Sequence, residues 1–207
     1  MDKTPQFEHY RTRADELYCY VSAGTAEKWR ADFSAIPDRV LNGNTYPGEY
    51  SIGAAHWRDP ELQRVMRERV CRAKAMGCDG IEFDNIDCYV RPSKCEGTRL
   101  DQIEYIRWLG ATARAHGLRV GCKNVGPIIQ GVRDTCDFYV AENCGRCPDY
   151  DQDSSKLLFI VNYNQPCDGA ALCKECWNSI PHARRSALPR PVRGRIWPLH
   201  KKRKRNP

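Results

Sequence analysis

The sequence predicts an α/β fold, a TIM (β/α)-barrel that is incomplete, followed by a disordered basic tail. Short apolar segments alternate with segments of helical periodicity, which is the pattern of a parallel sheet. Each apolar segment turns polar at its carboxyl end, where parallel α/β folds place their functional sites. The 207 residues hold five such strands and a weak sixth, whereas a closed barrel has eight strands and ~250 residues.

The first half of the chain contains two of these strands, the weak candidate and one long helix. Leu17–Gly24 is a short apolar run that ends in small residues, and Arg39–Asn42 is the weak strand. Apolar residues then recur at helical spacing over Pro60–Gly77. This stretch begins after an aspartate with proline and ends in glycine, as helices typically do. The strand Gly80–Asp87 follows directly.

The second half repeats the alternation. A helix is predicted over Thr98–Gly117, and it leads into the strand Arg119–Gly126. A shorter helical piece, Pro127–Thr135, precedes the strand Phe138–Cys144, and the last apolar strand is Leu157–Asn164. The order of strand, helix and strand therefore holds through most of the chain.

Four regions are predicted along the chain: an N-terminal extension (1–16), the barrel domain (17–165), a cysteine-rich turn region (166–177) and a basic tail (178–207). The net charge is +7, but the tail holds ten Lys or Arg and no acid, and removing them leaves residues 1–177 at −3. A mildly acidic body argues against nucleic-acid binding by the barrel. The run KKRKR at Lys201–Arg205 resembles a nuclear-localisation or polyanion-binding segment, or is a solvated tail. No membrane span is expected and no signal peptide is visible.

Twelve cysteines indicate disulfides in an oxidising compartment or metal sites. Cys88 and Cys95 flank one short loop, so we expect a disulfide between them. The pairs Cys144–Cys147 and Cys173–Cys176 fit a loose zinc-ribbon template, which supports the alternative of a zinc-dependent nucleic-acid-binding protein. The cysteines interpreted as buried free thiols are Cys71, Cys78, Cys122 and Cys136.

Acidic residues lie at the ends of two strands. In GIEFDNID, period-two alternation puts Glu82 and Asp84 on the barrel side and the apolar residues toward the helices. Glu142 ends a later strand, and Lys123 and Asn124 end the strand between. Since strand ends converge on one mouth, Asp84 and Glu142 are candidates for the carboxylate pair of a glycoside hydrolase.

Structural explanations of the same residues stay open. Glu142 is well placed to form a simple ion pair with Lys123 on the neighbouring strand. An aspartate after a strand often caps the loop that follows, and Asp87, with Asn85 nearby, suits that role.

Four stretches of the chain resemble one family of carbohydrate-cleaving enzymes. CYVSAGTAEKWR, DGIEFDNIDCY, QIEYIRWLGATARAHGLRVGCKN and FYVAENC are similar, in order and spacing, to glycoside hydrolase family 114, the endo-α-1,4-polygalactosaminidases. The resemblance implies a retaining mechanism without a cofactor, with Asp84 as nucleophile and Glu142 as acid/base. It implies an α-1,4-linked galactosamine polymer as substrate. The residues that it places around the sugar are Tyr20, Ser22, Asp87, Lys123, Asn124 and Tyr163.

The same resemblance leads to further expectations. An acidic mouth that includes Glu82 would attract the ammonium groups of a cationic polymer. Retaining enzymes hold their two carboxyl groups ~5–5.5 Å apart, so this spacing is expected for Asp84 and Glu142. Members of the family are secreted, which implies an extracellular location. They carry a cysteine pair after the Glu strand, which implies a disulfide of Cys144 instead of zinc.

The sequence also departs from the family. Members carry a further N-terminal strand and a signal peptide, and neither is visible here. We therefore expect the sheet to be open beside Leu17–Gly24 and the activity of this chain to be low. Asn162 stands where the family commonly has an acid, which affects substrate affinity. The remaining alternative is an inactive, truncated member that acts as a carbohydrate-binding protein.

Overall fold

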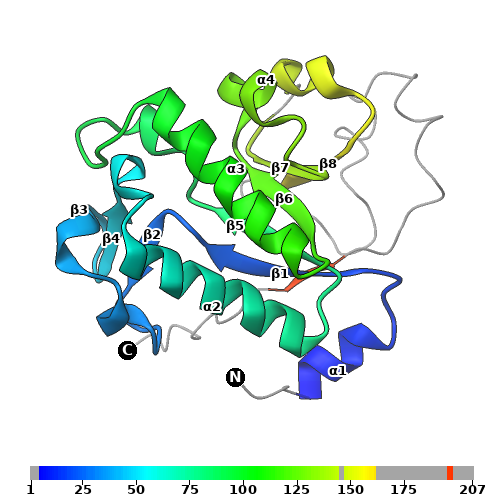
Figure 1. Cartoon of the computed structure of the whole chain (residues 1–207). Helices are drawn as coiled ribbons and strands as arrows, with labels where there is room; N and C mark the ends of the chain where they lie inside the picture. Colours follow the sequence, from blue (N-terminus) through cyan, green and yellow to red (C-terminus); the bar gives the residue numbers. More distant parts are fainter. Residues whose placement is uncertain (1–4, 145–146, 162–194, 198–207) are drawn as a thin grey trace, which may run out of the picture.

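A parallel sheet forms the centre of the molecule (Figure 1). The structure, a computed structural model, describes residues 5–144, 147–161 and 195–197. The sheet has the order β8-β7-β6-β5-β1-β9, and every neighbouring pair is parallel. Within the described residues it does not close into a barrel, since β8 and β9 are its edges. The predicted α/β fold is confirmed by the strands β1 (Leu17–Ser22), β5 (Gly80–Asp84), β6 (Arg119–Lys123), β7 (Phe138–Glu142), β8 (Leu157–Val161) and β9 (Arg195–Trp197).

Alternate residues of the strands face two different layers. One set, which includes Ile81 and Phe83, belongs to the main core with the helices. The other set includes Tyr18 and Phe138, whose ring centroids lie 4.4 Å apart. Gly121 makes room for these rings, because a Cβ there would come within 2.2 Å of the Phe138 ring. The acidic residues that alternate with the apolar ones of β5 therefore point to the barrel side, as predicted.

Two long helices, α2 (Pro60–Met76) and α3 (Arg99–Ala115), cover one face of the sheet (Figure 1). Asp59 caps α2 by accepting two backbone N–H groups, and Gly77 ends it with φ 88°. Thr98 starts α3 with a capping box. No helix in the described ranges is long and apolar enough to cross a membrane. The shorter helical elements are α1 (Pro5–Arg11), α4 (Ile129–Val132) and the 3-10 turns η1 (Phe33–Ala35), η2 (Asp38–Val40), η3 (Ala54–His56), η4 (Cys88–Val90), η5 (Gly126–Ile128) and η6 (Pro148–Asp153).

The weak strand predicted at Arg39–Asn42 does not join the parallel sheet. Its residues divide between η2 and the first strand of a hairpin, which belongs to an antiparallel sheet of order β2-β4-β3. These strands are β2 (Thr25–Glu27), β3 (Leu41–Tyr46) and β4 (Glu49–Ile52). Gly48, with φ 77°, lets the chain turn back directly between β3 and β4. The small sheet lies beside the carboxyl ends of β1 and β5 (Figure 1).

The edge of β1 is not open, so that prediction was wrong. Strand β9 pairs with it in parallel, with Leu17 opposite Arg195 and Cys19 opposite Trp197. This short part of the basic tail is therefore a strand, while 178–194 and 198–207 lie outside the described residues. The physical reason is that a distant segment supplies the backbone partners that an edge strand needs. Because β9 is distant from β1 in the sequence, no local pattern indicates this pairing.

The N-terminal helix α1, which the sequence analysis did not anticipate, packs on the barrel domain. Phe7 is buried in the main core. Arg11 Nη1 lies 2.5 Å from Oδ2 of Asp79, which also accepts the backbone N–H of Leu17 at 2.8 Å. One aspartate therefore fixes both the helix and the start of β1.

The described cysteines correct one interpretation and confirm another. Cys88 and Cys95 form the predicted disulfide, with Cα atoms 5.3 Å apart. The expected free thiols are mostly bonded, and Cys71, which is free, is exposed instead of buried. Packing brings Cys78 to Cys19 and Cys136 to Cys122, which are 59 and 14 residues apart in the sequence, so cysteine spacing alone does not reveal these pairs. The other disulfides are Cys19–Cys78, Cys122–Cys136 and Cys144–Cys147.

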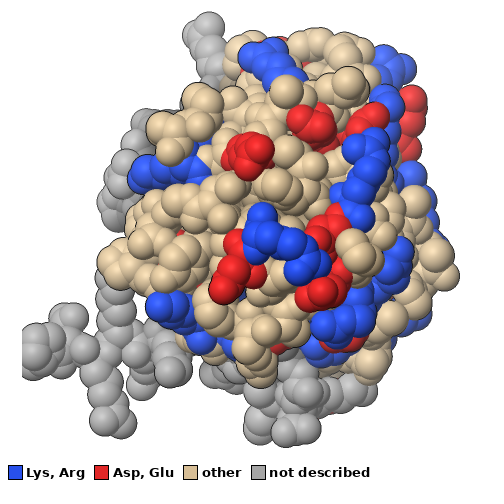
Figure 2. Space-filling view, turned by 60° about the vertical axis from the view of Figure 1, so that its left-hand side comes forward, with Lys and Arg blue, Asp and Glu red and all other residues tan. Residues whose placement is uncertain are grey.

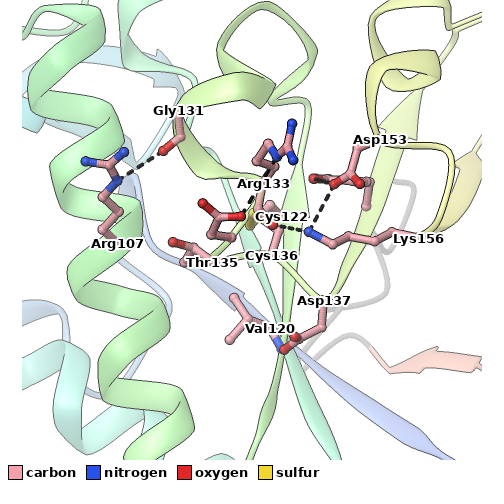
Figure 3. Close-up of a disulfide and its surroundings, with 12 residues drawn as sticks. Arg107, Val120, Cys122, Gly131, Arg133, Thr135, Cys136, Asp137, Asp153 and Lys156 are labelled. Carbon is pink, nitrogen blue, oxygen red and sulfur yellow. Dashed lines mark hydrogen bonds and ion pairs between the residues drawn. A yellow bond between two sulfur atoms is a disulfide. The ribbon is translucent and has the colours of Figure 1, made fainter.

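Figure 3 shows the disulfide between Cys122 and Cys136 in its surroundings. It links β6 to the residues just before β7. Beside it, Oδ2 of Asp137 accepts the backbone N–H of Val120 at 2.8 Å. The side chain and the disulfide together hold the start of β7 against β6, and Cys122 directly precedes the candidate site residue Lys123.

Candidate active site

Three neighbouring strands end in the same way, with a charged residue followed by asparagine. The asparagines have φ values of 60°, 55° and 50°. Asparagine adopts this left-handed conformation more readily than most other residues with a side chain. The chain turns out of the sheet there, and the preceding charged side chain stays on the barrel side. The three pairs are Asp84-Asn85, Lys123-Asn124 and Glu142-Asn143.

Lys123 lies between the two carboxylates that the sequence singled out. Its Nζ is 3.1 Å from Oδ2 of Asp84 and 2.7 Å from Oε1 of Glu142. A third carboxylate oxygen, Oε1 of Glu82, lies 3.9 Å from the same nitrogen. The ion pair of Glu142 with Lys123, considered above as a structural alternative, is thus present as one side of a larger cluster.

The shared lysine limits the spacing of the carboxylates. The oxygens of Asp84 and Glu142 that contact it cannot be further apart than 3.1 and 2.7 Å taken together. That limit lies below the ~6.5 Å at which the spacing of inverting glycosidases begins. It is compatible with the ~5–5.5 Å of retaining enzymes. The contacts with Lys123 thus set an upper limit on the separation, and the expected retaining spacing stays a prediction.

A cavity of about 380 Å³ opens at this end of the sheet. Figure 2 shows the face that lies to the left in Figure 1, where acidic and basic side chains gather in adjacent groups. Three acids and two bases line the cavity, so negative charge predominates by one when all are ionised. The cavity predicted to be acidic therefore also contains two cationic side chains, those of Arg91 and Lys123. The lining residues are Tyr46, Asp84, Asn85, Asp87, Arg91, Lys123, Asn124 and Glu142.

A chain of hydrogen bonds behind the cavity positions Asp84. Its Oδ1 accepts the backbone N–H of Asn85 at 2.7 Å, and Asn85 Nδ2 donates to Ser22 Oγ at 2.9 Å. The hydroxyls of Ser22 and Thr25 lie 2.5 Å apart. Gly24 permits this packing, because a Cβ there would lie 1.6 Å from the Asn85 carbonyl oxygen. Ser22, expected around the sugar, is fully buried behind the cavity and holds Asn85.

Asn124 holds Glu142 at two points. Its Oδ1 accepts the backbone N–H of Glu142 at 3.0 Å, and its Nδ2 donates to Oε2 of the carboxylate at 3.3 Å. Lys123 occupies the other carboxylate oxygen. The orientation of Glu142 is therefore set by two residues of the neighbouring strand, and both of them also line the cavity.

Glu82 lies deeper on the same strand as Asp84 and does not line the cavity. It is 2% exposed, and its Oε2 has no hydrogen-bond partner within the described part of the chain. Burial raises the pKa of Glu82 to about 7; Lys123 opposes this, while Asp84 and Glu142 add to it. Burial disfavours the ammonium of Lys123, but the surrounding carboxylates outweigh it and raise its pKa. Lys123 therefore stays charged while Glu82 changes charge near neutral pH.

Two further residues expected around the sugar lie beside the cluster, Tyr20 and Asp87. The Tyr20 ring centroid is 5.8 Å from Lys123 Nζ. Burial, and then Asp84, raises the pKa of Tyr20. Asp87 Oδ1 lies 2.5 Å from Nη2 of Arg91, and burial raises the Asp87 pKa against the opposing effect of Arg91. The Asp87 side chain makes no capping bond to the turn that follows, so the structural alternative of a cap is not observed.

Three lining residues were not among the predicted site residues. Asn85 directly follows Asp84 at the end of β5, whereas the other two come from outside the parallel sheet. Tyr46 ends β3 in the small sheet, and Arg91 lies in the loop that the Cys88–Cys95 disulfide closes. The surrounding NTYPG marks a turn in the sequence, but it carries no signal that this turn lies beside the cavity.

The remaining expectations concern Tyr163, Asn162 and zinc. Tyr163 and Asn162 lie outside the described residues, as do Cys173 and Cys176. The structure joins Cys144 to Cys147 in a disulfide, which leaves neither thiolate for a metal. The described ranges contain no group of three or more His, Cys, Asp or Glu that could hold a metal ion.

Comparison with solved structures identifies related folds. The crystal structure of Ega3 from Aspergillus fumigatus in complex with galactosamine matches 84% of this chain and 72% of that chain, with a TM-score of 0.71 and 25% identity. The glycoside hydrolase domain of PelA from Pseudomonas aeruginosa matches 65% of this chain and 53% of that chain, with a TM-score of 0.52 and 13% identity. The similarity to the PelA domain, at this low identity, shows a shared fold alone.

Comparison of the sequence finds a further relative and a matching family. An uncharacterised protein of Deinococcus radiodurans is 31% identical over an alignment of 105 residues, and the match covers 48% of this chain and 33% of that protein. This chain therefore spans about a third of that relative's length. A family model described as glycoside-hydrolase family GH114 matches residues 1–190, which is most of the sequence. The chain therefore belongs to glycoside-hydrolase family GH114.

Proposed function

We propose that this protein cleaves α-1,4-linked galactosamine polymers by a retaining mechanism, with Asp84 as nucleophile and Glu142 as acid/base. The observation that supports the proposal is that one nitrogen, Lys123 Nζ, contacts both carboxylates, so that their contacting oxygens lie closer together than the carboxyl groups of inverting enzymes. The related Ega3 structure, which contains galactosamine, supports an amino sugar as the occupant.

The two carboxylates divide the chemistry between them. Glu142 donates a proton to the glycosidic oxygen while an oxygen of Asp84 attacks the anomeric carbon, which gives a covalent glycosyl-enzyme. Water then attacks the same carbon, Glu142 takes its proton, and Asp84 leaves as a carboxylate. An ammonium 2.7 Å away favours the ionised form of Glu142. Because the proton donor has to be protonated, we infer that substrate binding separates Lys123 from Glu142, while the contact of Lys123 with Asp84 remains.

The charges around the cavity favour a cationic substrate. Arg91 is paired with Asp87, and Lys123 is shared between carboxylates, which leaves one negative charge in excess. An ammonium group on the sugar meets that excess, whereas a sulfated or carboxylated polymer is repelled. Four disulfides among the described residues suit an oxidising compartment, and we infer an extracellular location.

The test is to incubate the protein with deacetylated galactosamine polymer and to follow chain length and the first-formed anomer by NMR. We expect shortened oligosaccharides whose new reducing ends are initially α. Asp84→Asn and Glu142→Gln should each lower kcat by about 10²- to 10⁴-fold. Asp149→Asn, which changes a carboxylate that does not line the cavity, is the matched control.

Two outcomes would contradict the proposal in different ways. A β-anomer as the first product would exclude the retaining mechanism while leaving hydrolysis intact. Tight binding of the polymer without any cleavage would instead support the alternative of an inactive sugar-binding protein.

A further inference from the structure

We propose a second sugar-binding subsite at the rim of the cavity, where Tyr46 stacks against an amino-sugar unit next to the one that is cleaved. The inference rests on the proposed function, because the occupant is a further unit of the same polymer. Tyr46 is 71% exposed and nevertheless lines the cavity together with both proposed catalytic carboxylates. An exposed aromatic ring therefore lies at the edge of a polar cavity.

The ring is presented by a constrained segment. The Gly48 carbonyl at the turn next to Tyr46 accepts the backbone N–H of Lys28 at 2.9 Å, which ties the hairpin tip to β2. Asn42 Oδ1 accepts the backbone N–H of Glu96 at 2.9 Å, which ties the other end of β3 to the residue after the Cys88–Cys95 disulfide. Both attachments reduce the conformational freedom that Tyr46 would lose on binding.

The chemistry of the ring suits an amino sugar. One face of a pyranose carries C–H groups that pack on an aromatic ring, and an ammonium group is attracted by the same ring. None of the ring stacking and cation–π contacts among the described residues involves Tyr46. Asp87 lines the same cavity and offers a carboxylate to the polar edge of the sugar. Tyr46 and Asp87 thus supply an apolar and a polar contact for one unit.

The size of the cavity requires the polymer to extend beyond it. Its 380 Å³ lies near the lower end of the ~300–1,000 Å³ typical of ligand pockets. A chain of several sugar units must therefore cross the rim. Tyr46 belongs to the hairpin side of that rim, outside the strands that carry Asp84 and Glu142.

The experiment compares Tyr46→Ala and Tyr46→Trp with wild type on galactosamine oligomers of defined length. We expect Tyr46→Ala to raise KM for long oligomers about twofold to tenfold, the range for one aromatic contact, and to leave kcat nearly unchanged. Tyr46→Trp should retain wild-type KM. Trp29→Ala is the matched control, since Trp29 is also an exposed aromatic residue but does not line the cavity.

Calorimetry with the Asp84→Asn variant as background separates binding from turnover. There Tyr46→Ala should weaken the binding of long oligomers and leave that of the disaccharide unchanged. An unchanged affinity for long oligomers, or equal losses in the Ala and Trp variants, overturns the subsite while the wild type remains active. A wild type that neither binds nor cleaves the oligomers overturns the proposed function itself, and the subsite with it.

Discussion

Replacing Glu82 by glutamine removes a buried charge and preserves the shape of the side chain. Glu82 is 2% exposed, and its closest cation, Lys123 Nζ, is 3.9 Å away. Lys123 keeps closer counter-ions in Asp84 and Glu142, so the substitution leaves that ion cluster in place. The substitution should therefore raise the free energy of unfolding wherever Glu82 is ionised, because it removes one unfavourable buried charge.

The magnitude follows from the pKa. Burial raises the pKa of Glu82 from 4.5 to about 7. Each pKa unit corresponds to ~1.4 kcal/mol, so ionised Glu82 destabilises the folded state by about 3 kcal/mol. Below pH 4.5 the group is protonated in both states and has no effect. Between pH 4.5 and about 7 the unfolded chain releases its proton first, so stability falls as pH rises; above that range the full penalty persists.

The assay is urea unfolding of wild type and Glu82→Gln across this pH range. The two proteins should be nearly equal in stability at about pH 4, and the variant should be more stable by about 3 kcal/mol at about pH 8. Glu68→Gln, on the solvent side of α2, is the control and should show no comparable pH-dependent gain. A difference between Glu82→Gln and wild type that does not change with pH would refute the reasoning, because it would mean that Glu82 ionises in the folded state as it does in water.

Two further substitutions test the packing around the site. Lys123→Met leaves buried carboxylates without their cation, so it should lower the free energy of unfolding by about 3–5 kcal/mol. Urea unfolding should show a larger loss at pH 8 than at pH 5. Lys156→Met is the control, and equal losses for Lys123→Met at both pH values would contradict the explanation. Gly24→Ala places a methyl group 1.6 Å from the Asn85 carbonyl oxygen and should lower the thermal midpoint and kcat together, at a cost of about 1–3 kcal/mol or more. Gly43→Ala, whose added Cβ comes no closer than 3.4 Å to its neighbours, should leave both unchanged, and a harmless Gly24→Ala would show that the close approach is not required.

Local sequence patterns were sufficient to predict β1 and β5 to β8, the ends of α2 and α3, and the neighbouring positions of Asp84 and Glu142. The aspartate cap and terminal glycine of α2 act within a few residues, and the structure contains both. Period-two alternation placed Glu82 and Asp84 on the barrel side for the same reason. Each charged residue followed by asparagine marked a strand end at which the chain turns. The meeting of Asp84 with Glu142 also followed, because parallel strand ends share one edge of a sheet.

Contacts between distant segments were decided by the tertiary structure. The pairing of β9 with β1, the disulfide between Cys19 and Cys78 and the position of Tyr46 beside the cavity all join residues that no local pattern relates. The distances of Lys123 from three carboxylates, and the depth at which Glu82 is buried, depend on strand register and on packing from several elements at once. Periodicity fixes which side of a strand a residue faces, because that is a property of the backbone. It does not fix which distant segment lies opposite, because that depends on how the whole chain packs.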